Sequence, residues 1–319
     1  MAAVPGRGLA APVLSAAVIG ALSSWQGHLN GELARDLDDA RQAALVSMTI
    51  SLLIASVLLA VRPTMRAGLT RGLRAYRGGS LVWWQLLGGL GGATLLAAQS
   101  VVVPLVGVAL FTVAVIAAQT AASLAVDRAG LGPAGPQPLT SRRVLAAAIA
   151  VAAVVVSVFG KHGSFALAPL LLAALAGVAV AVQYALNGRV GVATADPMVA
   201  AWGNFVVGFL ALVVVFSIGA GVTGHPPGAL PNRWWLYLSG PIGVVFVAVA
   251  AHVVRVLGVL LFSLSVVCGQ VVGAVLIDVV SPTGGAGVGA ATLAGVAMTV
   301  LSVGVGSGVI GRRVQGSPT

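Results

Sequence analysis

The stretch Gln26-Gly27-His28-Leu29-Asn30-Gly31 returns 157 residues later as Gln183-Tyr184-Ala185-Leu186-Asn187-Gly188. A second match has an offset of 151 residues and pairs Trp83-Trp84 with Trp234-Trp235. At this offset four further residues of the first half meet identical residues of the second half: Gly107 and Gly258, Phe111 and Phe262, Gln119 and Gln270, Asp127 and Asp278. Identities in a fixed order predict two copies of one unit of about 155 residues. We place the first copy at 1–163 and the second at 164–319, within one transmembrane domain.

The composition indicates whether water or lipid surrounds this chain. Hydrophobic residues make up 59% of the 319 positions, glycine adds another 43 positions, and charged residues reach only 8%. A soluble domain has about 25% charged residues, so too few polar groups are present to cover a soluble surface. Disorder needs low hydrophobicity and is excluded as well. The sequence therefore predicts an all-α integral membrane protein.

Ten apolar stretches are long enough to cross a bilayer, for which about 20 residues are needed. Pro104 and Arg255 leave almost no loop after the third and eighth of them, and a basic loop is expected from Arg62-Pro63 to Arg77. The ten predicted spans are 9–30, 42–61, 82–103, 105–126, 142–160, 165–187, 197–219, 234–253, 255–278 and 286–310.

The basic residues predict the orientation. With the N-terminus inside, four of the 17 basic residues fall in outer segments: Arg35, Arg41, Lys161 and Arg233. The other thirteen fall in inner segments, as the positive-inside rule requires. This bias predicts a multi-pass protein with both termini in the cytoplasm, and the Ala, Val, Gly and Arg bias of the composition suggests a GC-rich bacterial genome and hence the bacterial plasma membrane. The net charge of +10 is then explained by anionic lipid, and no nucleic acid is expected as a partner.

Five spans in each copy force the second copy to enter the membrane from the opposite side. We therefore expect ten transmembrane helices arranged as two inverted five-helix repeats. Inverted repeats with a binding site near the midplane of the bilayer are a transporter architecture. Two such halves can expose one cavity to each side in turn.

Three sequence features resemble a known family. They are the Gln-x-x-x-Asn-Gly end of the first span, the Trp-Trp opening of the third, and the Gly-x-x-x-Phe…Gln…Asp pattern of the fourth. Together they resemble the YdcZ-like (EamA-like) branch of the drug/metabolite transporter superfamily, in which tandem fusions of two five-helix units give ten helices. The resemblance implies an inner-membrane carrier of small molecules, with export as its direction. This sequence departs from the family pattern at Ala118, where the second copy has Gly269, and at Arg255, where the first copy has Pro104.

Amide side chains are the candidate substrate ligands, because polar groups inside a membrane are costly unless they are paired or functional. Residues four apart share one helix face, so each amide pair can point into one cavity. Hydrogen bonding between helices is the alternative explanation for the same pairs. The candidates are Gln26, Asn30, Gln119, Gln183, Asn187 and Gln270.

Proton coupling has weaker candidates. His28 and His252 lie within predicted spans, and an imidazole with a pKa near ~6.5 suits coupling, although packing is the alternative. Asp278 is a third candidate because no basic residue adjoins it, whereas Asp127 is expected to be solvated or paired with the neighbouring Arg128. Arg255 is expected to reach lipid phosphate.

Several function classes have no supporting residues. No carboxylate lies in the middle of a span, which disfavours a carrier of cationic drugs. No nucleotide-binding loop or hydrolase motif is present, so neither ATP nor an enzymatic activity is expected. Cys268 is the only cysteine, and we expect no cofactor and no metal.

The resulting prediction is a secondary transporter of a small metabolite that works by alternating access and exports its substrate. Its expected partners are a small-molecule substrate and membrane lipid, and it is a monomer or a homo-oligomer. Two alternatives stay open. One is a non-transporting helper subunit of another membrane complex, and the other is a flippase for a lipid-linked molecule.

Overall fold

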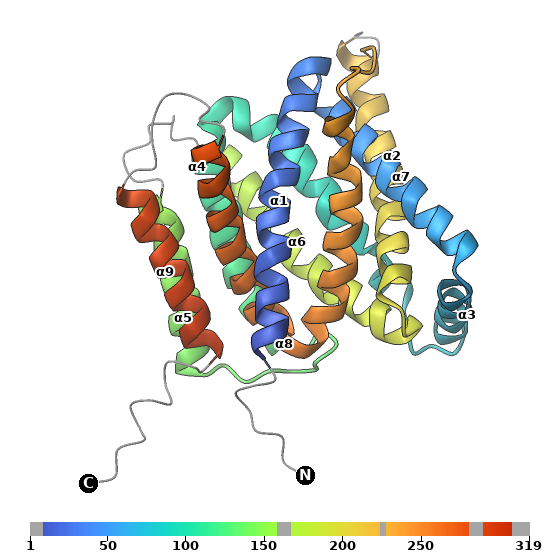
Figure 1. The fold of residues 1–319 in the computed structure, drawn as a ribbon. Coiled ribbons are helices and arrows are strands. Elements are labelled where there is room, and N and C mark those ends of the chain that lie inside the picture. The colour runs from blue at the N-terminus through green and yellow to red at the C-terminus, as the bar shows by residue number, and fades with distance from the viewer. Residues whose placement is uncertain (1–8, 158–166, 224–227, 281–289, 308–319) are drawn as a thin grey trace.

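A computed structural model describes residues 9–157, 167–223, 228–280 and 290–307. The described part of the chain is helical (Figure 1). The elements, in chain order, are α1 (Ala10–Leu37), α2 (Ala40–Val61), α3 (Pro63–Arg77), η1 (Trp83–Gly88), α4 (Gly89–Arg128), α5 (Ser141–Ser157), α6 (Leu167–Thr194), α7 (Pro197–Thr223), η2 (Trp234–Leu238), α8 (Ser239–Val280) and α9 (Ala290–Ser307).

Four stretches of the described helices are long and apolar enough to cross a membrane by length and composition. They are Ala40–Val61, Leu167–Thr194, Pro197–Gly219 and the 40-residue stretch Trp234–Gly273. Many large apolar side chains on these helices face outward, such as Leu53, Leu171 and Leu210. Outward-facing leucines are expected where the surrounding solvent is lipid rather than water.

Two predicted boundaries between spans are wrong. Pro104, which was expected to separate the third and fourth spans, lies inside the 40-residue α4. The eighth and ninth spans likewise form one element, α8, which is interrupted at Gly258 rather than at residue 254. Gly258 has φ 73° and ψ 169°, a conformation that glycine adopts at little cost. At about 1.5 Å per residue a straight helix of 40 residues would measure about 60 Å, twice the hydrocarbon thickness. Each of these elements is therefore long enough to hold two spans.

The predicted basic loop is also wrong, because residues 63–77 form the helix α3. Pro63 occupies its first turn, where a missing N–H costs nothing. Its buried residues are Met65, Gly68 and Gly72, which recur at helical spacing on one face. The arginines that suggested a loop lie on the remaining surface of the helix.

The helices pack in a pattern that repeats between the halves. α1 lies along α8, and α6 lies along α4. The second helices of the two copies, α2 and α7, pack on each other, and so do the last helices, α5 and α9. The contact between α1 and α8 in one half thus has its counterpart in the contact between α6 and α4 in the other.

Glycines permit the closest approach at these two crossings. A Cβ atom on Gly20 of α1 would collide with the carbonyl oxygen of Val266 and lie 3.1 Å from the backbone nitrogen of Gln270. A Cβ atom on Gly177 of α6 would collide with the carbonyl oxygen of Val115 and lie 2.9 Å from the nitrogen of Gln119. The glycines are related by the offset of 157 residues and their partners by the offset of 151 residues.

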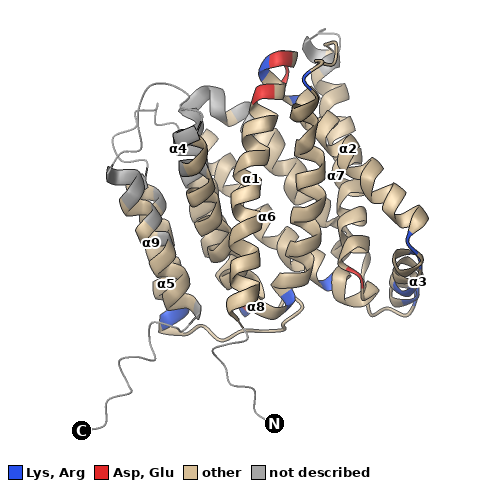
Figure 2. Ribbon diagram, viewed as in Figure 1, with Lys and Arg blue, Asp and Glu red and all other residues tan. Residues whose placement is uncertain are grey.

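Charged residues gather at the two ends of the helical bundle (Figure 2). We name these ends after the elements that lie there. The η2 end carries the acidic residues at the C-terminus of α1, and the α3 end carries the arginines of α3. Between the two ends the described ribbon is almost free of charge, as a membrane-spanning region requires.

Candidate functional site

Three buried amides form a network toward the α3 end. The side chains of Gln183 and Asn187 on α6 both donate to Oδ1 of Asn204 on α7, at 3.0 and 2.9 Å. Asn187 and Asn204 are each only 5% exposed. The four-residue spacing of Gln183 and Asn187 places both amides on one face of α6, as predicted. Asn204 was not among the predicted site residues.

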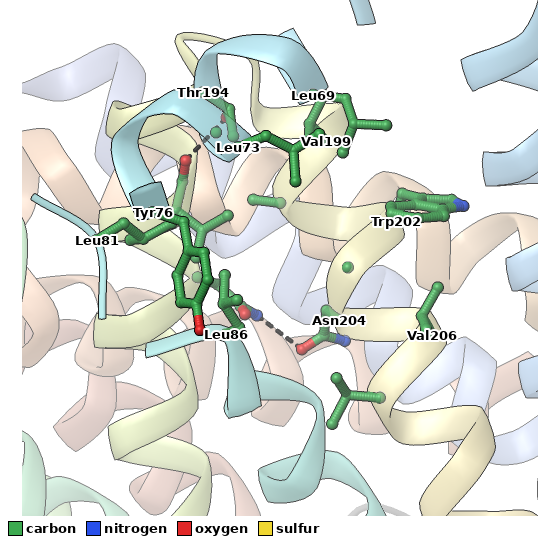
Figure 3. A pocket seen from close by; sticks show the side chains of 16 residues that line it. Leu69, Leu73, Tyr76, Leu81, Leu86, Thr194, Val199, Trp202, Asn204 and Val206 are labelled. Atoms are coloured by element: carbon green, nitrogen blue, oxygen red, sulfur yellow. Dashed lines mark hydrogen bonds between the residues drawn. The ribbon is translucent and has the colours of Figure 1, made fainter. Parts of the chain in front are cut away.

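A cavity of about 460 Å³ adjoins this network (Figure 3). Its walls come from α3, η1, α6 and α7, so both copies of the repeat contribute to it. The wall is mostly apolar and includes Leu69, Leu73 and Leu86. Asn187 and Asn204 bring hydrogen-bonding groups to it, in the manner of small-molecule sites that combine apolar walls with a few polar groups.

A matching network lies toward the η2 end. Gln26 of α1 donates to the carbonyl oxygen of Ser239 at 2.9 Å. The Ser47 hydroxyl donates to Oδ1 of Asn30 at 2.5 Å and lies 2.8 Å from the Ser239 hydroxyl. The offset of 157 residues relates Gln26 to Gln183, Asn30 to Asn187 and Ser47 to Asn204. The two copies of the repeat therefore carry equivalent polar networks at opposite ends of the bundle.

Ion pairs lie next to the network at the η2 end. Arg233, just before η2, contacts Glu32 at 2.8 Å and Asp36 at 3.0 Å, both on the last turns of α1. Its guanidinium also lies 5.1 Å from the ring centre of Trp235. His28 lies 3.5 Å from Glu32 and belongs to the same cluster. The residues equivalent to Arg233 and Asp36 at the α3 end are Val82 and Ala193, which cannot form an ion pair.

Asp39 and Arg41 form a second charged pair at the η2 end. The Asp39 carboxylate accepts hydrogen bonds from the Arg41 backbone at 2.8 Å and from its guanidinium at 3.0 Å. Burial raises the pKa of Asp39, but the hydrogen bonds from Arg41 outweigh it and hold the pKa below its usual value. The carboxylate is thus ionised at neutral pH and caps the N-terminus of α2.

Two further candidate amides lie away from the described cavity. Gln119 is buried and forms a side-chain hydrogen bond with Tyr184, whose ring packs edge-on against Phe262. Gln270 donates to the Ser23 hydroxyl at 3.0 Å, across the contact between α8 and α1. Gln119 and Gln270 are equivalent residues of the two copies, and each joins two helices by a hydrogen bond.

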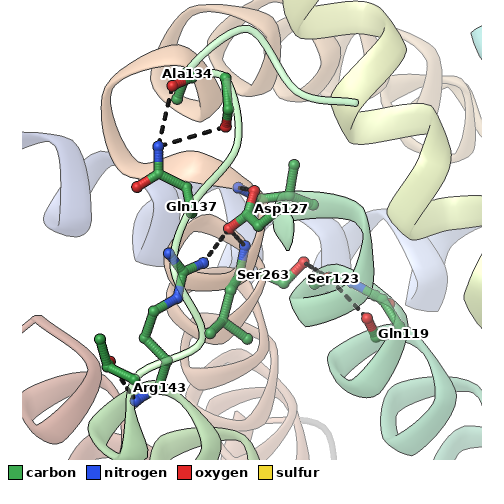
Figure 4. A network of polar contacts seen from close by, with 11 residues as sticks. Gln119, Ser123, Asp127, Ala134, Gln137, Arg143 and Ser263 are labelled. Atoms are coloured by element: carbon green, nitrogen blue, oxygen red, sulfur yellow. Dashed lines mark hydrogen bonds and ion pairs between the residues drawn. The ribbon is translucent and has the colours of Figure 1, made fainter. Parts of the chain in front are cut away.

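Asp127 differs from its prediction. It is 2% exposed rather than solvated, and its ion-pair partner is Arg143 of α5 rather than Arg128. Its carboxylate also accepts the backbone N–H groups of Val259 at 2.7 Å and Leu260 at 3.0 Å (Figure 4). These N–H groups follow the interruption of α8 at Gly258 and have no helical partner of their own. Asp127 therefore caps the second segment of α8 and joins three helices.

The candidates for proton coupling are dispersed. His28 lies in the ion cluster at the η2 end, whereas Nδ1 of His252 lies 2.7 Å from the guanidinium of Arg255. Arg255 thus has a protein partner in addition to any lipid phosphate. The Asp278 side chain lies outside the described residues. The structure brings no two of these three candidates together among the groups that it describes.

Among the described residues, no three His, Cys, Asp or Glu side chains form a group that could hold a metal ion. The polar lining of the cavity comes instead from neutral amides and hydroxyls. The described site can offer a ligand hydrogen bonds and apolar contact.

Comparison with known proteins agrees with the duplicated architecture. The model of the family described as "putative inner membrane exporter, YdcZ" matches the chain twice, at residues 11–156 and 168–305. The chain belongs to this drug/metabolite transporter family. It is a tandem member, with one match for each copy of the repeat, and a family of exporters is not an enzyme class.

A search of solved structures finds the same fold at low sequence identity. One crystal structure of a protein is 17% identical, with a TM-score of 0.64 over 97% of this chain and 99% of the other. No curated protein matches the chain. The YdcZ family match therefore carries the functional assignment at the level of an inner-membrane exporter, and the solved structure supports the fold alone.

Proposed function

We propose that the chain is a secondary transporter that exports a small metabolite across the bacterial plasma membrane by alternating access. One observation carries the proposal. Of two equivalent polar networks, the network at the α3 end adjoins a cavity of about 460 Å³, and the network at the η2 end lies next to the ion pairs of Arg233 with Glu32 and Asp36. Two repeat-related sites in different surroundings are what one state of an alternating-access cycle requires.

The packing of the helices supports an inverted arrangement of the two copies. Exchanging the copies turns the contact of α1 with α8 into the contact of α6 with α4. The same exchange leaves two contacts unchanged, because α2 is equivalent to α7 and α5 is equivalent to α9. Any two-fold axis between the copies produces this pattern, and the equivalent polar networks at opposite ends of the bundle favour an axis in the membrane plane, with α4 and α8 each contributing two of ten membrane spans. The arginine-rich α3 end then faces the cytoplasm, and both termini lie on that side.

The asymmetry between the two ends favours a transporter over a helper subunit. Arg233 of the second copy joins Glu32 and Asp36 of the first copy at the η2 end, and rigid-body movement of one half could break and remake these contacts. The family match supports export as the direction. A helper subunit needs no such difference between two equivalent sites.

Cysteine accessibility tests alternating access without knowledge of the substrate. Cys268 is the only cysteine, so Cys268→Ala gives a cysteine-free background. In this background we add Gly203→Cys at the cavity or Asn30→Cys at the opposite network, and label vesicles of either orientation with a membrane-impermeant maleimide. Gly203→Cys should react from the α3 side, whereas the half-buried Asn30→Cys, next to the ion pairs of Arg233, should react more slowly. Adding Arg233→Ala should raise labelling of Asn30→Cys several-fold from the η2 side and lower that of Gly203→Cys.

Arg35→Ala is the matched control, because Arg35 is an exposed arginine of α1 outside the ion cluster. It should leave both labelling rates unchanged. If Arg233→Ala also leaves both rates unchanged, the two ends do not open reciprocally and the transport proposal fails.

Topology provides a separate prediction. Reporter fusions after Arg77 and Arg313 should both read cytoplasmic, and a fusion after Gly163 should read periplasmic. The expectation follows from the positive-inside bias and from the odd number of spans in each copy. Paired alkaline phosphatase and fluorescent-protein fusions measure it. A cytoplasmic reading at Gly163 would contradict the inverted repeat.

A further inference from the structure

We infer that the cavity beneath α3 binds an uncharged, largely apolar molecule through a hydrogen-bond acceptor on that molecule. The inference rests on the proposed function, because it names the class of substrate for the same site. Three properties of the cavity support it: the size and apolar character of its walls, the charges around it, and its hydrogen-bonding group.

The walls determine the apolar part of the ligand. Leu69 and Leu73 of α3 lie on one side of the cavity and Val206 of α7 on the other, and Tyr76 and Trp202 contribute aromatic rings (Figure 3). Trp202 donates its indole N–H to Ser56 on α2, so its polar atom is already satisfied. A volume of about 460 Å³ falls within the range of about 300–1,000 Å³ for small-molecule sites.

The charges around the cavity exclude ions. The described lining contains neither acidic nor basic side chains, so a buried ion would lose its hydration without gaining a partner. α3 carries five arginines in or next to it, which would repel a cation on its way in: Arg62, Arg66, Arg71, Arg74 and Arg77. The Arg71 guanidinium donates to the carbonyl oxygen of Thr194 at 2.8 Å and so joins α3 to the end of α6.

Asn204 provides the polar group for the ligand. Its Oδ1 accepts two hydrogen bonds, from Gln183 and Asn187, which uses both lone pairs. Its amide nitrogen is not among the buried polar atoms left without a partner in the described residues, and the side chain lines the cavity. An amide N–H group in a cavity wall favours a ligand that brings an acceptor, such as a carbonyl or ether oxygen.

Three probes with one naphthalene body test the charge: 1-naphthylacetamide is neutral, 1-naphthylacetate is anionic and 2-(1-naphthyl)ethylammonium is cationic. Binding is measured by titration calorimetry with the full chain in lipid nanodiscs, and empty nanodiscs give the contribution of lipid alone. We expect the amide to bind at least tenfold more tightly than either ion. Equal or tighter binding of either ion would overturn the inference, as would a signal equal to that of empty nanodiscs.

Two variants at the cavity and one control locate the site. A Cβ atom on Gly203 would have no atom within 4 Å, so Gly203→Leu fills the cavity without a clash and should abolish binding of the amide probe. Gly221 of α7 is equally open and lies outside the lining, so Gly221→Leu should leave affinity unchanged. Asn204→Leu should weaken binding about tenfold. Unchanged affinity in Gly203→Leu would place the probe elsewhere and overturn the inference. Reciprocal cysteine labelling would remain a separate test of transport.

Discussion

Asp127→Ala should lower the free energy of unfolding by about 3–5 kcal/mol, the range for removing one partner of a buried ion pair. The substitution leaves the Arg143 guanidinium without its carboxylate and two N–H groups, those of Val259 and Leu260, without an acceptor. Unfolding by sodium dodecyl sulfate in mixed micelles, followed by circular dichroism, measures the loss.

Asp196→Ala is the control for Asp127→Ala. Asp196 precedes α7, and among the described residues its carboxylate accepts only the N–H of Met198, at 2.9 Å, so its loss should cost about 1 kcal/mol. Arg143→Ala should resemble Asp127→Ala, and the double variant should cost much less than the sum of the two, because the partners are coupled. Additive losses would show that the ion pair does not hold α4, α5 and α8 together.

The duplication could be predicted from the sequence because identical residues recur at a fixed offset and can be aligned without a structure. Residues four apart on a helix share one face. The structure accordingly places Gln26 and Asn30 in one network, and Gln183 and Asn187 in the other. The missed partners Ser47 and Asn204 are single polar residues in apolar helices. The offset of 157 residues that pairs the two amide stretches also pairs Ser47 with Asn204, and was the signal that could have found them.

Asp127 shows what the sequence could not reveal. Its neighbour in sequence is Arg128, but its partners are Arg143 on another helix and the backbone of Val259, 132 residues away. Burial of a carboxylate depends on tertiary contacts, which local charge does not encode. α3 was missed for a related reason, because its arginines obscured the spacing of Met65, Gly68 and Gly72.

Gly20→Leu and Gly177→Leu should each lower the free energy of unfolding by about 3 kcal/mol, at the upper end of the usual cost of overpacking. The new Cβ atoms would collide with main-chain carbonyl oxygens, of Val266 and of Val115 respectively, which cannot turn away as a flexible side chain can. Each pair of helices would have to separate along its length. The contacts made by Gln270 with Ser23, and by Gln119 with Tyr184, lie at the same crossings and would be lost with them.

Gly27→Leu provides the matched control for this pair. Gly27 lies on α1, seven residues after Gly20, and a Cβ atom there would have no atom within 4 Å. Replacing a helical glycine at an open position should stabilise the helix by up to about 1 kcal/mol. Equal losses in Gly20→Leu and Gly177→Leu, with none in Gly27→Leu, are expected if the two crossings are equivalent parts of a duplicated fold. A loss confined to one of them would mean that the copies no longer share this contact, and that the symmetry of the helix packing does not extend to its energetics.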